Sequence, residues 1–416
     1  MNSPSPGRYA WIVVALLFPV ALLNYLDRQM IAAMKLSVMG DVHDMALESQ
    51  WGYMLGQFKW VYAFFSPIGG YVADRFSRRW TIGGSLLGWS LITWLTGHVT
   101  SYDGLLWTRT AMGLSEAFYI PAALALISDY HRGDTRSRAT GIHQMGIYCG
   151  VILGGFAGYA ADAPAIGWRS TFNFTGLVGI LYAFPLLFLL RDRPRGNGEN
   201  SAPKPKAVHS VRALLTNGSF LLLVLYFTLP ALAGWVVRDW MPAILQQSFN
   251  ISQGLAGVSA TLYWQAAAIV AAFGGGWLAD KWMGRTRRGR IYVSAIGMAL
   301  IIPALFGVGN APGLGSFSLA IASLVLFGIG WGFFDTNNMP ILCQIAKPEL
   351  RATGYGIMNF VSISCGGFAD WGFGAMRDRD VPLNAIFGVF AAACVISVVL
   401  VLLIRPRSDL EPDSGT

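Results

Sequence analysis

One apolar stretch of the chain, LLWTRTAMGLSEAFYIPAALALIS at 105–128, contains an arginine, Arg109, and a glutamate, Glu116. An ionisable side chain at membrane depth costs about 2.5–3.5 kcal/mol on insertion scales, so it persists where it faces protein or water. Residues seven apart share one face of an α-helix and lie about 10 Å apart along its axis. Arg109 and Glu116 are therefore predicted to form a charged stripe that points away from lipid.

A second charged pair, Asp27 and Arg28, lies in the apolar run 9–33. If that helix starts inside near Tyr9, Asp27 lies roughly 27 Å along it, nearly level with Arg109 and above the deeper Glu116. We expect Asp27 to contact Arg109 in at least one conformation. The alternative is a permanent ion pair that only fastens two helices together.

These four side chains can bind an anion and carry a proton. The planar guanidinium groups of Arg28 and Arg109 match a carboxylate with two parallel hydrogen bonds. A carboxyl in a poorly solvated cavity shifts its proton affinity as the cavity opens and as a nearby arginine approaches or leaves. The pattern predicts Asp27 and Glu116 as proton-coupling residues, with Arg109 freed for the anion when Asp27 is protonated.

Further polar and aromatic residues of the apolar runs are candidates for the wall of the same cavity, since amides and indoles suit sugar hydroxyls and ring faces. These candidate substrate-binding residues are Tyr25, Arg28, Tyr62, Arg109, Tyr119, Gln144, Trp235, Trp264, Gln265, Asp335, Asn337, Asn338 and Asn359. For the aromatic residues, packing in the core is the alternative. Lys59 either faces the cavity or extends toward the surface, His143 is interpreted as a hydrogen-bonded helix residue, and Asp370 as solvated or helix-capping.

The elements that position these residues are predicted from composition. The chain has 416 residues, of which 54% are hydrophobic and 12% charged, about half the charged fraction of soluble domains. A membrane-spanning helix needs about 20 largely apolar residues. Twelve runs qualify: 9–33, 53–73, 80–98, 103–129, 137–161, 169–190, 216–246, 255–279, 290–309, 316–340, 352–372 and 382–404. We therefore expect an all-α integral membrane protein with twelve transmembrane helices.

The net charge of +8 indicates topology, because basic segments fall on alternate connections and at the C-terminal end. Lys- and Arg-rich loops stay in the cytoplasm, so both termini are predicted to be cytoplasmic. The basic excess is thereby explained without a nucleic-acid partner. Three of the four cysteines lie in these apolar runs and Cys343 lies three residues beyond one, and the four show no metal-ligand spacing. We therefore expect neither a metal site nor a bound cofactor.

The long polar stretch 191–215 divides the chain into two halves, 1–190 and 216–416, each predicted to form a six-helix bundle. The halves share phrases: GGYVADRFSRR at 69–79 and GGWLADKWMGR at 275–285, and RATG at 138 and at 351. Duplicated helical halves are typical of transporters, whose substrate site lies at the membrane midplane between the repeats.

The stretch Gly70-x-x-x-Asp74-Arg75-x-x-Arg78-Arg79, with a weaker copy at 276–281, resembles the signature loop of the major facilitator superfamily. NYLDR at 24–28, RTAMGLSEAFYIPA at 109–122 and GWRSTF at 167–172 resemble the anion:cation symporters, which carry hexuronates, galactonate and sialic acid. Spinster-like lipid carriers share the first two patterns. The resemblance implies gating roles for Asp74, Arg75, Arg78 and Asp280.

The resemblance and the charged stripe together predict a proton-coupled symporter of a small organic anion such as a sugar acid. It would act by alternating access as a monomer in the lipid bilayer of a bacterial inner membrane, with the proton as coupling ion. A spinster-like carrier of lysolipids or sphingolipids is the alternative, as are uniport and exchange of an anion. A membrane enzyme is disfavoured, because polar residues are spread over many helices and no His-Glu-x-x-His or Gly-x-Ser-x-Gly string occurs.

Overall fold

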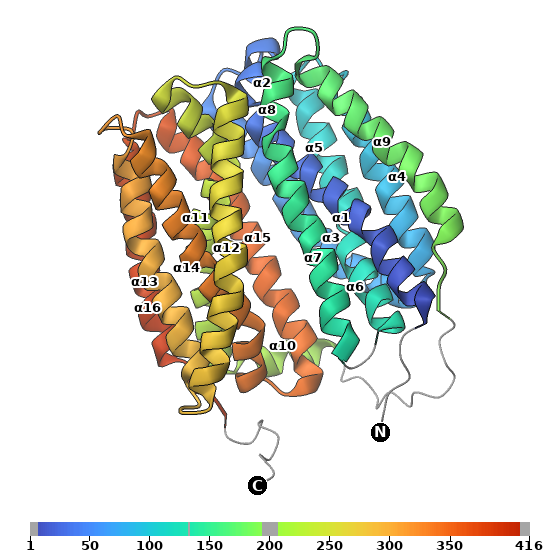
Figure 1. Ribbon diagram of the computed structural model, residues 1–416, viewed down its shortest axis with the longest axis vertical. Helices are drawn as coiled ribbons and strands as arrows, with labels where there is room; N and C mark the ends of the chain where they lie inside the picture. Colours follow the sequence, from blue (N-terminus) through green and yellow to red (C-terminus); the bar gives the residue numbers. More distant parts are fainter. Residues whose placement is uncertain (1–6, 132–133, 194–206, 408–416) are drawn as a thin grey trace. The chain divides into compact units, whose positions relative to one another are not determined.

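The computed structural model describes residues 7–131, 134–193 and 207–407, in which the regular elements are all α-helices (Figure 1). These helices are α1 (Arg8–Ala33), α2 (Lys35–Asp41), α3 (Glu48–Arg75), α4 (Arg78–Thr96), α5 (Tyr102–Glu116), α6 (Tyr119–Tyr130), α7 (Asp134–Gly155), α8 (Ala157–Asp162), α9 (Gly167–Leu189), α10 (Ala207–Leu215), α11 (Gly218–Phe249), α12 (Gln253–Met283), α13 (Gly289–Asn310), α14 (Phe317–Ile345), α15 (Pro348–Arg377) and α16 (Leu383–Leu403).

Each of the twelve predicted runs coincides with a long helix or with a helix pair interrupted by a short break, α5–α6 or α7–α8. Eight segments of the described chain are long and apolar enough to cross a membrane: α1, 102–130, α9, α11, α12, α13, α14 and α16. The all-helical membrane fold is therefore confirmed. The count of twelve spans and the cytoplasmic side of the termini remain predictions.

The chain divides into two compact units. Unit 1 comprises Met1–Asn197 together with Arg238–Thr261 and Asp370–Ala375, so short segments of α11, α12 and α15 belong to it. Unit 2 comprises Gly198–Val237, Leu262–Ala369 and Met376–Thr416. The boundary between Met1–Asn197 of unit 1 and Gly198–Val237 of unit 2 falls inside the stretch 191–215, which the composition predicts to be a linker.

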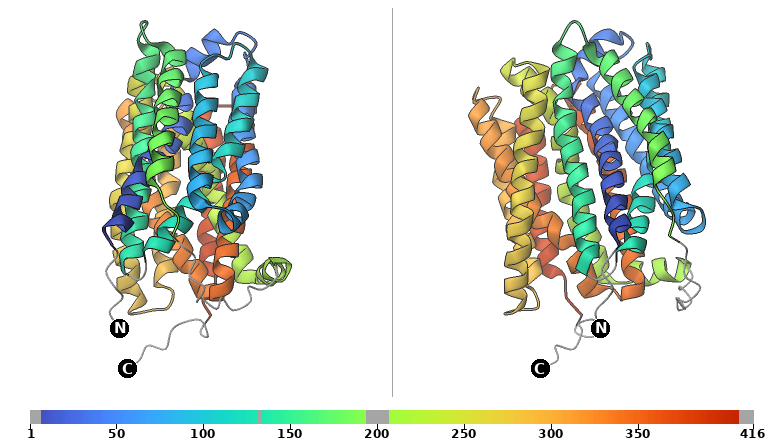
Figure 2. Two further views of the ribbon diagram at one scale, coloured as in Figure 1. Left: turned by 90° about the vertical axis from the view of Figure 1, so that its right-hand side faces the viewer. Right: turned by 45° about the vertical axis from the view of Figure 1, so that its right-hand side comes forward.

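Within unit 1, α1 and α7 lie side by side over much of their length (Figures 1 and 2). Glycines on α7 permit this close approach: a Cβ atom on Gly150 would lie 2.2 Å from the Leu22 carbonyl oxygen of α1. Within unit 2, α13 packs on α14 and α16, and a Cβ on Gly297 would lie 2.7 Å from the Gly330 carbonyl oxygen. Small residues that let helix backbones approach are typical of membrane helix packing.

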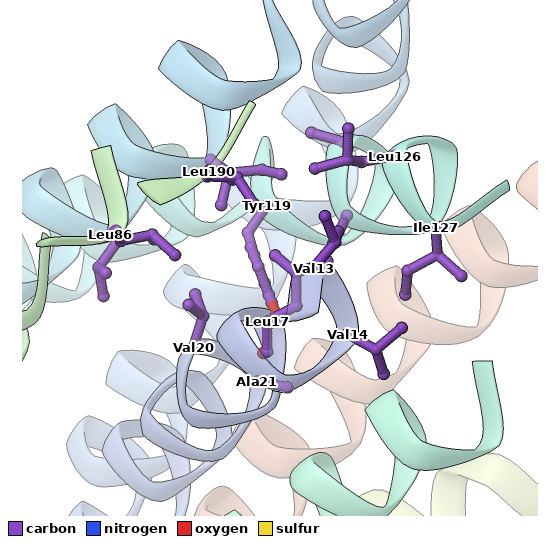
Figure 3. Packing of buried hydrophobic residues seen from close by; sticks show 14 of the residues in the cluster. Val13, Val14, Leu17, Val20, Ala21, Leu86, Tyr119, Leu126, Ile127 and Leu190 are labelled. Atoms are coloured by element: carbon purple, nitrogen blue, oxygen red, sulfur yellow. Dashed lines mark hydrogen bonds between the residues drawn. The ribbon is translucent and has the colours of Figure 1, made fainter. Parts of the chain in front are cut away.

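An apolar cluster of buried residues forms the core of unit 1 near the start of α1 (Figure 3). Val13, Leu17 and Val20 of α1 contribute to it together with Leu126 of α6 and Leu190 after α9. This cluster packs α1 against α6. Helix α1 carries Asp27 and Arg28, and α6 begins three residues after Glu116.

The predicted run 103–129 is interrupted after Glu116, where α5 ends, and α6 begins at Tyr119. Pro121 accounts for the interruption, since its ring nitrogen carries no N–H to donate to the Ala117 carbonyl four residues earlier. Glu116 therefore lies at a break in a buried helix, where the backbone no longer continues the regular hydrogen-bond ladder.

Candidate functional site

Four charged side chains of α1 and α5 are buried inside unit 1. Glu116 is 0% exposed, and Asp27 and Arg109 are each 2% exposed. Arg28 lies nearest to the solvent, with 10% of its side chain exposed. The two acids and two arginines that the sequence singles out are thus gathered within one compact unit and away from its surface.

Arg28 and Glu116 form a direct ion pair, with 2.5 Å between Arg28 Nε and Glu116 Oε2. The guanidinium group of Arg28 also lies over three aromatic rings, 4.5 Å from the centroid of Tyr62, 4.8 Å from Tyr25 and 5.0 Å from Phe58. A charge-assisted hydrogen bond and cation–π contacts both fix the guanidinium plane. The predicted site residues Tyr25 and Tyr62 therefore lie directly at the charged pair.

Asp27 does not pair with Arg109 in this conformation. Its Oδ2 accepts a hydrogen bond of 3.0 Å from the Thr93 hydroxyl of α4, and its Oδ1 has no hydrogen-bond partner in the described chain. The observed ion pair is Arg28 with Glu116, whereas depth along the helices predicted Asp27 with Arg109. The difference arises because helix side chains point back toward the helix N-terminus. That direction carries the Arg28 side chain along α1 toward the level of Glu116, and away from the level at which Asp27 and Arg109 were expected to meet.

Arg109 is buried without a direct acid partner. Within the described chain, Nε and Nη2 have no hydrogen-bond acceptor, and the guanidinium carbon lies 5.9 Å from the ring of Phe172 on α9. Buried hydrogen-bond donors that stay unpaired are costly, typically about 1–3 kcal/mol each and more when charged. This arginine is thus poised to bind an added acceptor such as a carboxylate.

Arg238 of the α11 segment in unit 1 extends this group of arginines. Its guanidinium carbon lies 5.1 Å from the centroid of the Tyr25 ring, which also contacts Arg28. The backbone carbonyl of Arg238 accepts a 3.0 Å hydrogen bond from Gln29 Nε2. Composition alone did not assign Arg238 to the site, although a charge inside an apolar run was the signal that could have done so.

Tyr119 belongs to the apolar core of unit 1. Tyr119 is 0% exposed within the apolar core, where its hydroxyl donates to the Leu17 carbonyl at 3.2 Å and is hydrogen-bonded to His143 Nε2 at 2.9 Å (Figure 3). This placement favours packing over substrate contact for Tyr119, and it agrees with the interpretation of His143 as a hydrogen-bonded helix residue. Gln144 follows it on α7 and is half-buried.

The interpretation of Asp370 as a solvated residue is wrong. Asp370 is 0% exposed, and Lys59 of α3, itself 3% exposed, is paired with both Asp370 of α15 and Asp239 of α11. The neighbouring basic and acidic residues of the sequence suggested a helix end in water. They gave no indication of a partner 311 residues away in the chain.

Unit 2 contains the remaining predicted site residues. Trp264 is 5% exposed, contacts the rings of Phe327 and Trp331, and has an indole N–H without a hydrogen-bond partner in the described residues. On α14, Asn338 Nδ2 donates to Asp335 Oδ1 at 3.5 Å, while Asn337 Nδ2 donates to the Phe333 carbonyl of its own helix.

The burial of the other unit 2 candidates differs from residue to residue. Asp335 is exposed, Gln265, Asn337 and Asn338 are buried, and Trp235 and Asn359 are half-buried. The side-chain amide of Asn337 donates to its own helix backbone, so this donor is not available to a ligand. Asn338 Oδ1 lacks a partner within the described chain and could accept a hydrogen bond from a ligand.

The predicted gating residues make local contacts within each unit. Arg78 is paired with Asp129 and donates to the Ala125 carbonyl at 3.3 Å, and Arg75 lies 4.6 Å from the ring of Tyr71. In unit 2, Asp280 lies 3.5 Å from Arg290. The side chain of Asp74 is outside the described part of the structure.

The described residues form an all-helical fold, with eight segments long and apolar enough to cross a membrane and with buried charges of both signs. The chain belongs to the Major Facilitator Superfamily, whose model matches residues 17–369. The chain is thus an integral membrane protein of a superfamily of transporters, which are not enzymes.

Two curated relatives and one solved structure are similar to the chain. It is 26% identical to protein spinster of Drosophila melanogaster over 87% of the chain and 61% of the relative, so it spans about three fifths of that protein's length. It is 25% identical to the "Probable L-galactonate transporter" of Escherichia coli K12 over 98% of the chain and 92% of the relative. A bacterial homologue of the human lysosomal transporter spinster, solved in an inward-facing, unoccupied conformation, matches with a TM-score of 0.78 and 22% identity over 96% of each chain.

Proposed function

We propose that the chain is a proton-coupled symporter of a small organic anion, with a sugar acid such as a hexuronate, an aldonate or sialic acid as substrate. The observation that carries this proposal is the ion pair of Arg28 with Glu116, buried beside Asp27 and the unpaired Arg109. Two arginines provide the affinity for an anion, and two acids provide places for a proton.

Competition for Arg28 would couple the two ligands. While Glu116 is ionised, its carboxylate occupies the guanidinium group that an incoming carboxylate needs. Protonation of Glu116 removes its negative charge and weakens that bond, so Arg28 becomes available to the substrate. Arg109, which lacks an acceptor in the described chain, supplies a second donor group nearby. Occupied in this way, the site holds the proton and the anion together.

Alternating access in this proposal follows the superfamily's two six-helix bundles, with twelve spans and both termini in the cytoplasm. The transporter would act as a monomer in a bacterial inner membrane, with no cofactor other than the proton. Asp27, Arg109 and Glu116 are nearly fully buried in the present conformation. Substrate entry therefore requires a movement that exposes these three residues.

The relatives support the substrate class. The Escherichia coli relative is described as a probable transporter of L-galactonate, a sugar acid, and its similarity extends over 98% of this chain. A sugar acid has one carboxylate and several hydroxyls. The carboxylate matches the guanidinium groups of Arg28 and Arg109 in unit 1.

Purified protein in proteoliposomes tests the proposal. The first step is a thermal-shift screen against L-galactonate, hexuronates, sialic acid and lysolipids, because a ligand that binds the folded state raises its melting temperature. The second step measures uptake of the best sugar acid with and without an inward proton gradient. Gradient-driven accumulation supports the proposal, whereas stabilisation by no anion, or uptake indifferent to the gradient, contradicts it.

A spinster-like lipid carrier is the second candidate, because the 26% identity to Drosophila spinster extends over 87% of this chain. A lysolipid phosphate would use the same arginines as a sugar carboxylate. The two candidates separate in the screen above. Stabilisation by lysolipids but not by sugar acids would favour the lipid carrier.

A further inference from the structure

A surface cavity of about 380 Å³, here named the α10 cavity, lies at one end of unit 2. It is formed where α10, the start of α11 and the connection from α14 to α15 meet, and its wall includes Leu214, Thr216, Asn217, Ile345, Lys347 and Arg407. Asn217 Nδ2 donates to the Ile345 carbonyl at 3.0 Å, and the Arg407 backbone N–H donates to the Gln344 carbonyl at 2.9 Å. Hydrogen bonds therefore hold together the segments that form the cavity.

The α10 cavity is basic, and no acidic side chain of the described chain lines it. Lys347 on its wall is exposed, as are Arg212 on α10 and Arg405, whose backbone N–H donates to Ser219 Oγ at the start of α11. No salt bridge joins Lys347, Arg212 or Arg405 to an acid of the described residues. The exposed Glu349, in the first turn of α15, is one acid against these three cations. The charge around the cavity is therefore positive even without Arg407.

A second basic cavity, of about 200 Å³ in unit 1, differs in this respect. Its wall carries Arg75, Arg78 and Arg193, but also two acids, Asp129 and Asp192. Arg78 is paired with Asp129, and Arg193 donates to the Asp129 backbone carbonyl. The cavity of unit 1 thus supplies its own anions, whereas the α10 cavity is open to an added one.

Apolar side chains adjoin the α10 cavity on its exposed side. Helix α10 runs across the direction of the long helices of unit 2 (Figures 1 and 2). Val211 and Leu215, one turn apart on α10, are exposed, and so are Leu221 and Leu225, one turn apart on α11. The Leu221 N–H donates to the carbonyl of Asn217 on the cavity wall. A helix with an apolar exposed face and basic residues lies in the plane of the membrane interface.

The end of unit 2 that carries the cavity is the one predicted to be cytoplasmic. Gln344 Nε2 donates to the Arg287 carbonyl at 3.1 Å, which places the basic connection 284–288 at the same end as the start of α15. Lys- and Arg-rich connections stay on the cytoplasmic side. Basic pockets on this side of helical membrane proteins bind anionic lipid headgroups.

We infer that the α10 cavity binds the phosphate headgroup of an anionic phospholipid such as phosphatidylglycerol, with the acyl chains along the exposed leucines of α11. Cations attract the phosphate, and the apolar face of α10 keeps this helix in the same leaflet. One Lys or Arg near an anionic lipid surface changes the affinity about fivefold. The inference goes beyond the proposed function, because it does not depend on which solute is transported or on proton coupling.

Native mass spectrometry of the purified full-length chain measures the binding. We expect phosphatidylglycerol to bind at least roughly tenfold more tightly than phosphatidylcholine with the same acyl chains. Arg212→Gln and Lys347→Gln should each weaken the binding of phosphatidylglycerol about fivefold, and together about 25-fold, and leave that of phosphatidylcholine unchanged. Equal affinity of the unsubstituted protein for the two lipids would overturn the inference.

Arg285 provides the matched control, because it is exposed at the same end of unit 2 and does not line the cavity. Arg285→Gln should bind phosphatidylglycerol as the unsubstituted protein does. A loss in Arg285→Gln as large as in Lys347→Gln would show that net charge alone attracts the lipid, which contradicts a site at the cavity.

Photo-crosslinking locates the lipid in the unsubstituted protein, so it does not depend on whether a variant folds. Phosphatidylglycerol with a photoreactive group in one acyl chain should label the segment 211–225, and excess unlabelled phosphatidylglycerol should prevent this labelling. Labelling confined to other segments would contradict the inference.

Two other occupants of the α10 cavity are separated by the same measurements. If soluble glycerol phosphate displaces phosphatidylglycerol as well as unlabelled phosphatidylglycerol does, the cavity binds free phosphate and the inference fails. Asp409, Glu411 and Asp413 follow Arg407 in the sequence, outside the described residues. If phosphatidylglycerol binds only after removal of residues 408–416, this acidic segment is the occupant and the inference fails. Binding by the full-length chain that glycerol phosphate does not displace supports the lipid site, whatever the outcome of the sugar-acid screen.

Discussion

Arg28 Nε lies 2.5 Å from Glu116 Oε2, so the arginine of α1 is bound to the acid that ends α5. The contact joins residues 88 positions apart, and the Arg28 guanidinium lies over the rings of Tyr25 and Tyr62. Because Glu116 has no exposed surface, its protonation state decides whether Arg28 has a charged partner. In the proposed mechanism, the pair therefore connects proton binding to anion binding.

Glu116→Gln should abolish proton-driven accumulation of the substrate and preserve exchange of substrate across the membrane. Glutamine keeps the shape of the side chain and an acceptor oxygen, but it cannot gain or lose the coupling proton. Uptake into proteoliposomes with and without a proton gradient measures the first property, and counterflow measures the second. The exposed acid Glu349 provides the control, since Glu349→Gln should leave both properties unchanged. Full uphill uptake by Glu116→Gln would remove Glu116 as the coupling acid.

Arg109→Lys should weaken anion binding roughly tenfold to a hundredfold, because hydrogen bonds to charged groups contribute about 1.5–3 kcal/mol and lysine cannot offer the planar fork. Titration calorimetry with the best sugar acid measures the affinity. The exposed Arg379 is the matched control, and Arg379→Lys should bind as the unsubstituted protein does. An unchanged affinity in Arg109→Lys would place this arginine outside the substrate site.

The gathering of charges could be predicted from the sequence because a physical rule enforces it. Ionisable groups in apolar helices must face protein or water, so Asp27, Arg28, Arg109 and Glu116 had to point away from lipid. The positions of the long helices were likewise predictable from length and hydropathy. Each of the twelve runs corresponds to a helix or an interrupted pair in the structure.

The partners of these charges could not be predicted, since they depend on the axial offset of neighbouring helices and on side-chain direction. Sequence spacing placed Arg28 level with Arg109, yet its side chain extends to Glu116. Lys59, Asp239 and Asp370 were each visible as a charge inside an apolar run. Nothing local indicated that residues 180 and 311 positions apart would meet.

Tyr119→Phe should lower stability without changing substrate affinity. The substitution removes the hydroxyl that binds His143 and the Leu17 carbonyl, and an intramolecular hydrogen bond contributes about 0.5–1.5 kcal/mol. Thermal unfolding in detergent measures the loss, and the thermal shift produced by the sugar acid reports binding. Tyr263 is the control, because it is 43% exposed and Tyr263→Phe should leave both quantities unchanged. A loss of affinity in Tyr119→Phe would return Tyr119 to the substrate site.

Gly150→Val tests whether close packing of α7 on α1 positions the charged residues. A Cβ at Gly150 would lie 2.2 Å from the Leu22 carbonyl oxygen, and overpacking of this kind costs about 1–3 kcal/mol. Because Leu22 precedes Asp27 by little more than one helical turn, the displaced helix should also disturb the bond of Arg28 with Glu116. The variant is therefore expected to lose both thermal stability and anion binding.

Gly141 on the same helix is the matched control, since a Cβ there would meet nothing within 4 Å. Valine carries the same backbone preference at both positions, so any difference between the two variants reports the contact with α1 alone. Melting temperature and sugar-acid affinity should match the unsubstituted protein in Gly141→Val and fall in Gly150→Val. Equal melting temperatures for the two variants would show that α1 and α7 have room to separate, and that this contact does not hold Asp27 and Arg28 in place.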